Sequence, residues 1–170
     1  MSRTEKIEQN NAKWFRGSAF AQEGYDPEFE AFARGFLCGD VLEHGVLTDK
    51  QKALVTLVAL ATCQTIAHLP AYVRAALDVG AAPEEIKETL YQCAPYIGLE
   101  RVRCALDVVN QVFREEEIPL PREKQGTVTE ETRFDQGLAV QQQIFGAENI
   151  NRMRESAPPE LKHIQDYLSA

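Results

Sequence analysis

Apolar residues recur at intervals of three and four along most of the chain, the spacing that gathers them on one face of an α-helix. Pro, Gly and short polar stretches interrupt this spacing and mark the predicted helix ends. The predicted helices cover residues 4–16, 27–44, 49–66, 70–77, 83–93, 99–117, 130–145 and 159–170. No stretch keeps the alternation typical of a β-strand, so the pattern predicts an all-α fold.

The helix predicted at residues 49–66 differs from the others because it has no polar face. Thr48 and Gln51 form a capping box, in which each side chain satisfies a free backbone N–H at the helix start. Residues 53–61 are apolar on all sides apart from Thr56. A helix of this kind is typical of the middle of a bundle or an assembly. We therefore expect it to be buried on every side.

A Pro-containing stretch divides the helical regions. Residues 118–121 read Ile-Pro-Leu-Pro, and polar residues follow to about position 128. This composition predicts a helical domain at 1–118, a linker at 119–128 and C-terminal helices at 129–170.

The last predicted helix repeats the pattern of the second, since both begin with Pro-Glu and carry apolar residues in the same phase. The matching positions are Phe29, Phe32 and Phe36 in the second helix and Leu161, Ile164 and Leu168 in the last. The C-terminal region thus looks like the start of a second, truncated copy of the domain. Such a fragment cannot bury its apolar face alone. We expect it to pack on its own domain or, by swapping, on a neighbouring subunit.

The formal charge is −8, and the Lys and Arg residues are scattered. Nucleic-acid binding depends on a basic face that contacts phosphates, so no nucleic-acid partner is expected and the acidity is interpreted as an aid to solubility. No apolar run is long enough to span a bilayer, and the N-terminal residues lack the apolar segment of a signal peptide. These features predict a cytoplasmic protein without a membrane partner.

Cysteine and histidine patterns limit the chemistry further. The four cysteines, Cys38, Cys63, Cys93 and Cys104, show no Cys-x-x-Cys spacing, and their default role in a reducing compartment is that of small buried apolar residues. The three histidines are dispersed without clustered carboxylates. No metal site and no cofactor is therefore expected.

Four motifs in consistent order carry a resemblance to a known family. They are Leu-Thr-Asp-Lys-Gln-Lys-Ala-Leu-Val-Thr-Leu at 47–57, Leu-Pro-Ala-Tyr-Val-Arg-Ala-Ala-Leu-Asp-Val-Gly at 69–80, Ala-Pro-Glu-Glu-Ile-Lys-Glu at 82–88, and Tyr-Gln-Cys-Ala-Pro-Tyr-Ile-Gly-Leu at 91–99. With a core motif at 47–113, the chain resembles the carboxymuconolactone decarboxylase-like proteins of the alkylhydroperoxidase D-like superfamily. The resemblance implies an all-α helical bundle, a homotrimer or homohexamer, and active sites for small molecules near subunit contacts.

The sequence departs from the peroxidases of that superfamily at every reactive position. Those enzymes use a Cys-x-x-Cys pair, a histidine four residues later and an upstream glutamate. The corresponding positions here are Thr65 and His68 for the cysteines, Tyr72 for the histidine and Ala53 for the glutamate. A two-cysteine redox cycle is therefore not expected at this site.

The polar residues that remain near this position are the candidate catalytic and substrate-binding groups. His68 and Tyr72 are the candidate catalytic residues for decarboxylation: donors would stabilise the enolate as carbon dioxide leaves, and His68 would deliver the proton. Gln64 and Thr65 are candidate substrate-binding residues. The alternative is that all four cap and pack a buried helix junction.

Cys63 is the candidate nucleophile of a second chemistry. On a continuous helix Cys63 and His68 lie about 140° apart around the axis, so a direct contact requires the helix to end or bend between them, as Pro70 permits. A neighbouring His68 could then favour a thiolate that attacks peroxide. The alternative is an inert buried cysteine.

Cys93 and Tyr96 lie in the Gln-Cys-Ala-Pro-Tyr-Ile-Gly motif, where Pro and Gly predict a tight corner. The motif is interpreted as structural, and as a candidate wall of the substrate pocket. Three functions follow from the sequence: a decarboxylase-like enzyme acting on a small carboxylate or lactone, a one-cysteine peroxidase that uses Cys63 and an external thiol, and a catalytically silent oligomeric scaffold.

Overall fold

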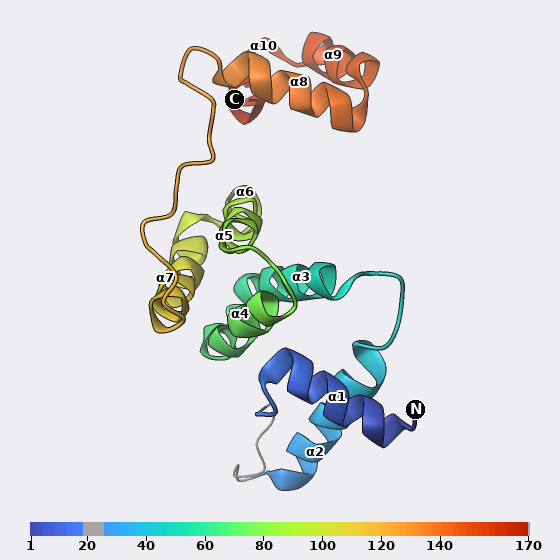
Figure 1. Cartoon of the computed structure of the whole chain (residues 1–170). Coiled ribbons are helices and arrows are strands. Elements are labelled where there is room, and N and C mark those ends of the chain that lie inside the picture. Colours follow the sequence, from blue (N-terminus) through green and yellow to red (C-terminus); the bar gives the residue numbers. More distant parts are fainter. Residues whose placement is uncertain (19–25, 170) are drawn as a thin grey trace. The chain divides into compact units, whose positions relative to one another are not determined.

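The computed structural model describes residues 1–18 and 26–169, with the side chains of the last helix described as far as Tyr167. Every regular element in these residues is helical, which confirms the predicted all-α fold (Figure 1). The elements are α1 (Arg3–Phe15), α2 (Pro27–Phe36), the π-helix η1 (Leu37–Val41), α3 (Asp49–Thr62), the 3-10 turn η2 (Ile66–His68), α4 (Leu69–Asp78), α5 (Pro83–Tyr91), α6 (Ala94–Ile97), α7 (Leu99–Glu115), α8 (Arg133–Phe145), α9 (Ala147–Ser156) and α10 (Pro159–Ser169).

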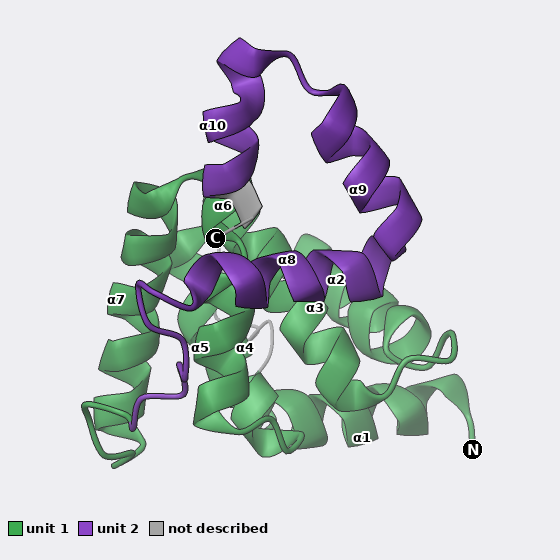
Figure 2. Cartoon of the chain, turned by 90° about the horizontal axis from the view of Figure 1, so that it is seen from above, with its two compact units in different colours: residues 1–122 green, residues 123–170 purple. Residues whose placement is uncertain are grey.

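The chain forms two compact units, residues 1–122 and residues 123–170, coloured green and purple in Figure 2. In the first unit, α3, α4, α5 and α7 pack around a common apolar core. Each contributes a fully buried side chain, namely Leu57, Val73, Leu90 and Phe113 in that order. These helices therefore hold the central part of the fold, where the four sequence motifs lie.

The first helix packs on α4 and η1. It begins at a capping box, in which the Ser2 hydroxyl accepts from the Glu5 backbone N–H at 3.2 Å and the Glu5 carboxylate accepts from the Ser2 N–H at 2.6 Å. Its last turn buries Trp14 and Phe15, and the chain then turns at Arg16 with a positive φ of 52°. The end of α1 is thereby placed against α4.

The central helix α3 is shorter and less enclosed than the sequence predicted. The capping box of Thr48 and Gln51 is present, but the helix ends at Thr62 because Gln64 adopts a positive φ of 58°. One face is buried, whereas Val55 on the opposite face is 58% exposed. Within the single chain, the other helices of the first unit cover one face of α3. Burial of the opposite face in a subunit assembly stays a prediction.

The second unit consists of α8, α9 and α10, with α8 packed against both of the others. Helix α9 was not predicted from the sequence, and α8 begins at Arg133 rather than at Glu130. Helix α10 begins at Pro159, as predicted. Ile150 is the sole buried side chain among those described in this unit. Its apolar side chains that are exposed are Val128, Val140, Ile144, Phe145, Met153, Leu161, Ile164 and Tyr167.

The helices in the described parts of the chain include none with the length and apolar character needed to cross a membrane.

Candidate functional site

The first unit contains a cavity of about 630 Å³ where the end of α1 meets α4. Its walls also include residues of α2, α3 and the turn that leads into α4. The lining residues are Trp14, Phe15, Arg16, Ser18, Phe29, Glu30, Leu60, Thr65, His68, Ala71, Tyr72, Arg74 and Asp78. The cavity thus combines aromatic walls with a small set of polar side chains, as ligand sites do.

The aromatic part of the wall comes from both helices. Trp14 is 1% exposed, and the ring of Phe15 meets the ring of Tyr72 edge-on at a centroid distance of 5.4 Å. Burial raises the pKa of the Tyr72 hydroxyl above its ordinary value of 10, and the nearby Cys38 thiol adds to this effect. Tyr72 therefore stays protonated at neutral pH and can donate a hydrogen bond.

Two of the polar side chains share one face of the helix start. His68 is the N-cap of α4 and Tyr72 lies four residues later, a spacing that places both on the same face. Within the described part of the chain, neither side chain has a hydrogen-bond partner. Thr65 lies in the same wall, and its hydroxyl donates to the Leu60 carbonyl at 3.2 Å. His68 and Tyr72 are therefore available to a bound molecule.

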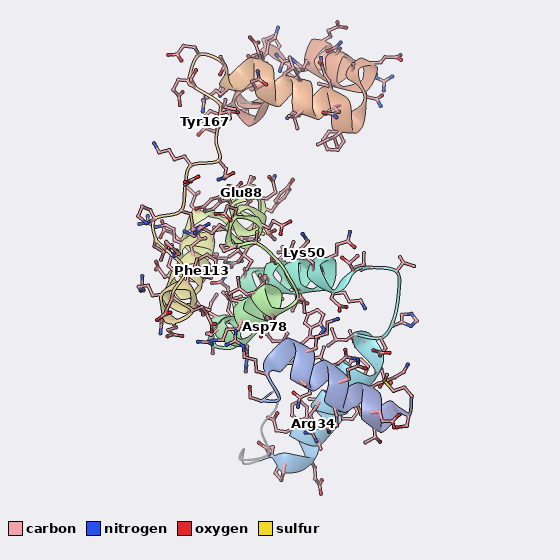
Figure 3. The ribbon with its side chains drawn as sticks, viewed as in Figure 1. Arg34, Lys50, Asp78, Glu88, Phe113 and Tyr167 are labelled. Atoms are coloured by element: carbon pink, nitrogen blue, oxygen red, sulfur yellow. The ribbon has the colours of Figure 1, made fainter. Side chains whose placement is uncertain are left out.

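An ion-pair network closes one side of the cavity and joins α1, α4 and the end of α7. Arg16 donates to Asp78 at 2.8 and 2.9 Å and to Glu116 at 2.9 and 3.0 Å. Arg74 donates to Glu116 at 3.0 Å and also to Glu115. Asp78, labelled in Figure 3, is the last residue of α4. These bonds fix the arginine side chains beside the aromatic wall.

The network also shifts the pKa values of Glu116 and Arg16. Hydrogen bonds from Arg16 lower the pKa of the Glu116 carboxyl from its ordinary value of 4.5, and Arg74 adds to this effect. The Asp78 and Glu116 carboxylates raise the pKa of the Arg16 guanidinium. The ion pair of Arg16 and Glu116 is therefore charged at neutral pH.

Three of the residues predicted from the sequence line this cavity, namely Thr65, His68 and Tyr72. Cys63 and Gln64 are not among its lining residues. Cys63 is the exposed C-cap of α3, and the Gln64 side chain donates to the Ala61 carbonyl at 2.5 Å. Gln64 therefore serves to end the helix in this structure.

The other two predicted residues lie elsewhere in the first unit. Cys93 is buried, and its thiol donates to the Thr89 carbonyl at 3.3 Å. Tyr96, in the short helix α6, is 82% exposed. Neither residue lines the cavity.

Sequence reasoning missed the part of the cavity formed by α1 and by the ion pairs. Trp14, Phe15 and Arg16 carry no local sign of a site, because only the packing of α1 on α4 brings them there. Arg74 and Asp78 do carry such a sign. They lie three and seven residues after Ala71, the spacing that places these three residues on one helix face.

The residues that the structure describes include no cluster of three His, Cys, Asp or Glu side chains. The hydroxyl, imidazole and guanidinium groups that line the cavity can all donate hydrogen bonds to oxygen.

Comparison with known proteins agrees with the sequence motifs. A protein described as 4-carboxymuconolactone decarboxylase from Acinetobacter baylyi (strain ATCC 33305 / BD413 / ADP1) is 26% identical over 91 residues, which cover 54% of this chain and 68% of that protein. The profile of the carboxymuconolactone decarboxylase family matches residues 27–111, half of the chain. Helix α1 precedes this match, whereas α2 to α6 and most of α7 lie within it. The chain therefore belongs to the carboxymuconolactone decarboxylase family.

Proposed function

We propose that the protein is a decarboxylase of a small carboxylated lactone and that the reaction takes place in the cavity between α1 and α4. The observation that carries this proposal is the pair His68 and Tyr72. Both line the cavity on one face of α4, and neither side chain has a hydrogen-bond partner among the described residues. The family and the name of the Acinetobacter relative supply the reaction class and the kind of substrate.

Decarboxylation through an enolate requires a hydrogen-bond donor to the carbonyl oxygen and a source of a proton. When carbon dioxide leaves a carbon conjugated with a lactone carbonyl, the bonding electron pair moves to the carbonyl oxygen and forms an enolate. The Tyr72 hydroxyl, protonated because burial raises its pKa, would donate to that oxygen. His68 would then deliver a proton to carbon, so that one carboxylate and one proton yield carbon dioxide and a C–H bond.

The aromatic wall would assist the departure of carbon dioxide. Trp14 is 1% exposed and Phe15 is also buried, so a carboxylate against them is poorly hydrated. Loss of its charge as neutral carbon dioxide forms is therefore favoured relative to the same step in water.

The test is decarboxylation of 4-carboxymuconolactone by the purified protein, followed as loss of substrate and release of carbon dioxide. We expect His68→Gln to lower kcat by about a hundredfold or more, since a positioned acid contributes on that scale. Tyr72→Phe should lower kcat by about a hundredfold through loss of the enolate donor. His163→Gln on α10, an exposed histidine, is the matched control and should leave kcat unchanged.

Other outcomes separate the remaining functions. Wild-type activity in both His68→Gln and Tyr72→Phe would contradict the proposed site. Absence of lactone turnover together with peroxide consumption that needs dithiothreitol and is lost in Cys63→Ala would identify a one-cysteine peroxidase. Absence of both activities, with an intact assembly, would leave the scaffold.

A further inference from the structure

We propose that Arg74 is the residue that binds a substrate carboxylate in this cavity, and that Glu116 is the positioning residue that orients it. The inference rests on the proposed function in that it takes the cavity to be the substrate site. It adds a specificity residue that acts on binding, separate from the groups that would carry the chemical step.

The first argument is that Arg74 keeps unused donors beside the cavity. A guanidinium has five N–H donors in one plane. In Arg74, Nε donates to Glu116 at 3.0 Å and Nη2 donates to Glu115. Among the described residues, Nη1 has no partner, so both of its hydrogens remain for a ligand. Arg74 also lines the cavity, whereas Glu115 and Glu116 do not.

The second argument is that the Arg74 side chain is held in place before any ligand arrives. The same Glu116 oxygen that accepts from Arg74 Nε accepts from Arg16 Nη1 at 3.0 Å. Arg16 is itself held by Asp78. Glu116 is thus bound from both α1 and α4, and Arg74 is fixed through it. A fixed planar donor loses less conformational entropy when it binds a carboxylate.

Arg16 does not share this property, although it lines the same cavity. Its Nε, one Nη1 hydrogen and both Nη2 hydrogens donate to Asp78 or Glu116. Four of its five donors are therefore engaged. Arg16 therefore uses its donors within the ion-pair network, whereas Arg74 keeps the Nη1 hydrogens for a ligand.

The carboxylate bound by Arg74 is not the one that leaves. An arginine paired with the leaving carboxylate would stabilise the ground state more than the transition state and would slow the reaction. Arg74 therefore holds a carboxylate that the product retains. Its loss should raise KM for such a substrate and change kcat much less.

Glu115 is a competitor for the same guanidinium. The network contains two arginines and three carboxylates, Asp78, Glu115 and Glu116, so its net charge is −1. The Glu115 side chain is 45% exposed and contacts Arg74 alone within the network. Removing its charge should therefore strengthen binding of an anionic ligand.

Trp14 supplies the readout. It is the one tryptophan in the sequence and it lines the cavity, so ligand binding should change the intrinsic fluorescence of the protein. The probes are (5-oxotetrahydrofuran-2-yl)acetate, a saturated γ-lactone whose carboxylate lies on the side chain that the product would retain, and its neutral methyl ester. We expect the wild-type protein to bind the acid more tightly than the ester.

Variants of Arg74 and Glu115 test which side chain causes the preference for the acid over the ester. Arg74→Met should weaken binding of the acid by about tenfold or more, because a charge-assisted hydrogen bond is lost, and should leave the ester unchanged. Arg74→Lys keeps the charge but loses the planar guanidinium, so its affinity for the acid should lie between those of the wild type and Arg74→Met. Glu115→Gln should tighten binding of the acid by about two- to fivefold. Arg103→Met on α7, an exposed arginine whose one carboxylate partner among the described residues is Glu100, is the control and should behave as wild type.

The outcomes are distinguishable from those of the proposed function. Equal binding of acid and ester by the wild type overturns the assignment, and so does a wild-type preference in a folded Arg74→Met or Arg74→Lys protein. Circular dichroism establishes folding. If the wild type prefers the acid through Arg74 but does not decarboxylate 4-carboxymuconolactone, the assignment of Arg74 as a carboxylate-binding residue is supported and the proposed decarboxylase function is contradicted.

Discussion

At the scale of single residues, one carboxylate controls much of the candidate site. Glu116 follows the last residue of α7, is about 22% exposed, and accepts hydrogen bonds from both Arg16 and Arg74. Charge-assisted bonds of this kind are stronger than neutral ones. The same bonds lower the pKa of Glu116, which links the stability of the network to pH.

Replacing Glu116 should therefore change how stability responds to acid. Because the pKa of Glu116 is lower in the folded than in the unfolded protein, its stabilisation is present above about pH 4.5 and is lost as pH falls through the folded-state pKa. Glu116→Gln should lower the free energy of unfolding at pH 7 by on the order of 1 kcal/mol. The two proteins should converge in strong acid.

The measurement is urea unfolding of the wild type and Glu116→Gln between pH 2.5 and 7. Glu123→Gln, at an exposed glutamate outside the network, serves as the control and should follow the wild-type curve. A difference between wild type and Glu116→Gln that stays constant across this range would show that the charge of Glu116 is not what stabilises the network.

At the scale of helices, α3 shows which residues determine where a helix begins and ends. Its start follows from the capping box, where the Thr48 hydroxyl accepts from the Gln51 N–H at 3.3 Å and the Gln51 side chain accepts from the Thr48 N–H at 2.9 Å. Its end follows from Gln64, which leaves the helix and allows η2 to carry His68 toward the cavity. The helix boundaries thus position the candidate site.

Removing the cap should destabilise the first unit. Thr48→Ala loses the acceptor for the Gln51 N–H and should lower the free energy of unfolding by about 1 kcal/mol. Thr62→Ala, in the last turn of the same helix and exposed, should change it by no more than a few tenths of a kcal/mol. Chemical denaturation followed by circular dichroism compares them. Equal effects of the two changes would argue against the cap.

At the scale of the whole molecule, the two units differ in how much apolar surface they bury. The first has an extended core of buried side chains, whereas Ile150 is the one buried residue among those described in the second. Leu161 and Ile164, at the repeat positions of α10, are 48% and 46% exposed. Phe29 and Phe32, the corresponding residues of α2, are 64% and 68% exposed. The expected homotrimer or homohexamer stays a prediction. We expect its subunit contacts to include these exposed apolar residues of α2 and α10.

Deletion of residues 127–170 tests the role of the second unit. We expect the truncated protein to keep the helices of the first unit. We also expect it to form an assembly of fewer subunits than the full chain, because apolar contacts between subunits are removed. Multi-angle light scattering and thermal unfolding give the assembly mass and the melting point. A protein that keeps the number of subunits and the melting point of the full chain would show that these helices take no part in assembly.

A full-length control keeps the second unit and alters only its exposed apolar side chains. Replacing Leu161 and Ile164 with Gln should change the assembly in the same direction as the deletion. Replacing the exposed Lys162, which lies between them, with Gln should leave it unchanged.

The sequence by itself determined the features that depend on neighbouring residues. Helical spacing and capping boxes are local, so the all-α fold and the start of α3 at Thr48 follow from them. The motifs that resemble the family also brought attention to Thr65, His68 and Tyr72, which line the cavity. Helix α9 was missed because its sequence is strongly polar, so that few apolar residues mark its buried face.

Only the tertiary structure decided which residues complete the cavity and which face of α3 is covered. Trp14 and Arg16 reach the cavity through the packing of α1 on α4, and Arg16 binds Glu116 across 100 residues of sequence. Spacing along a helix identifies residues that share a face, but it does not say which other helix meets that face. Contacts between distant segments depend on the packing of the whole unit, and for this reason the ion-pair network was absent from the sequence-based site.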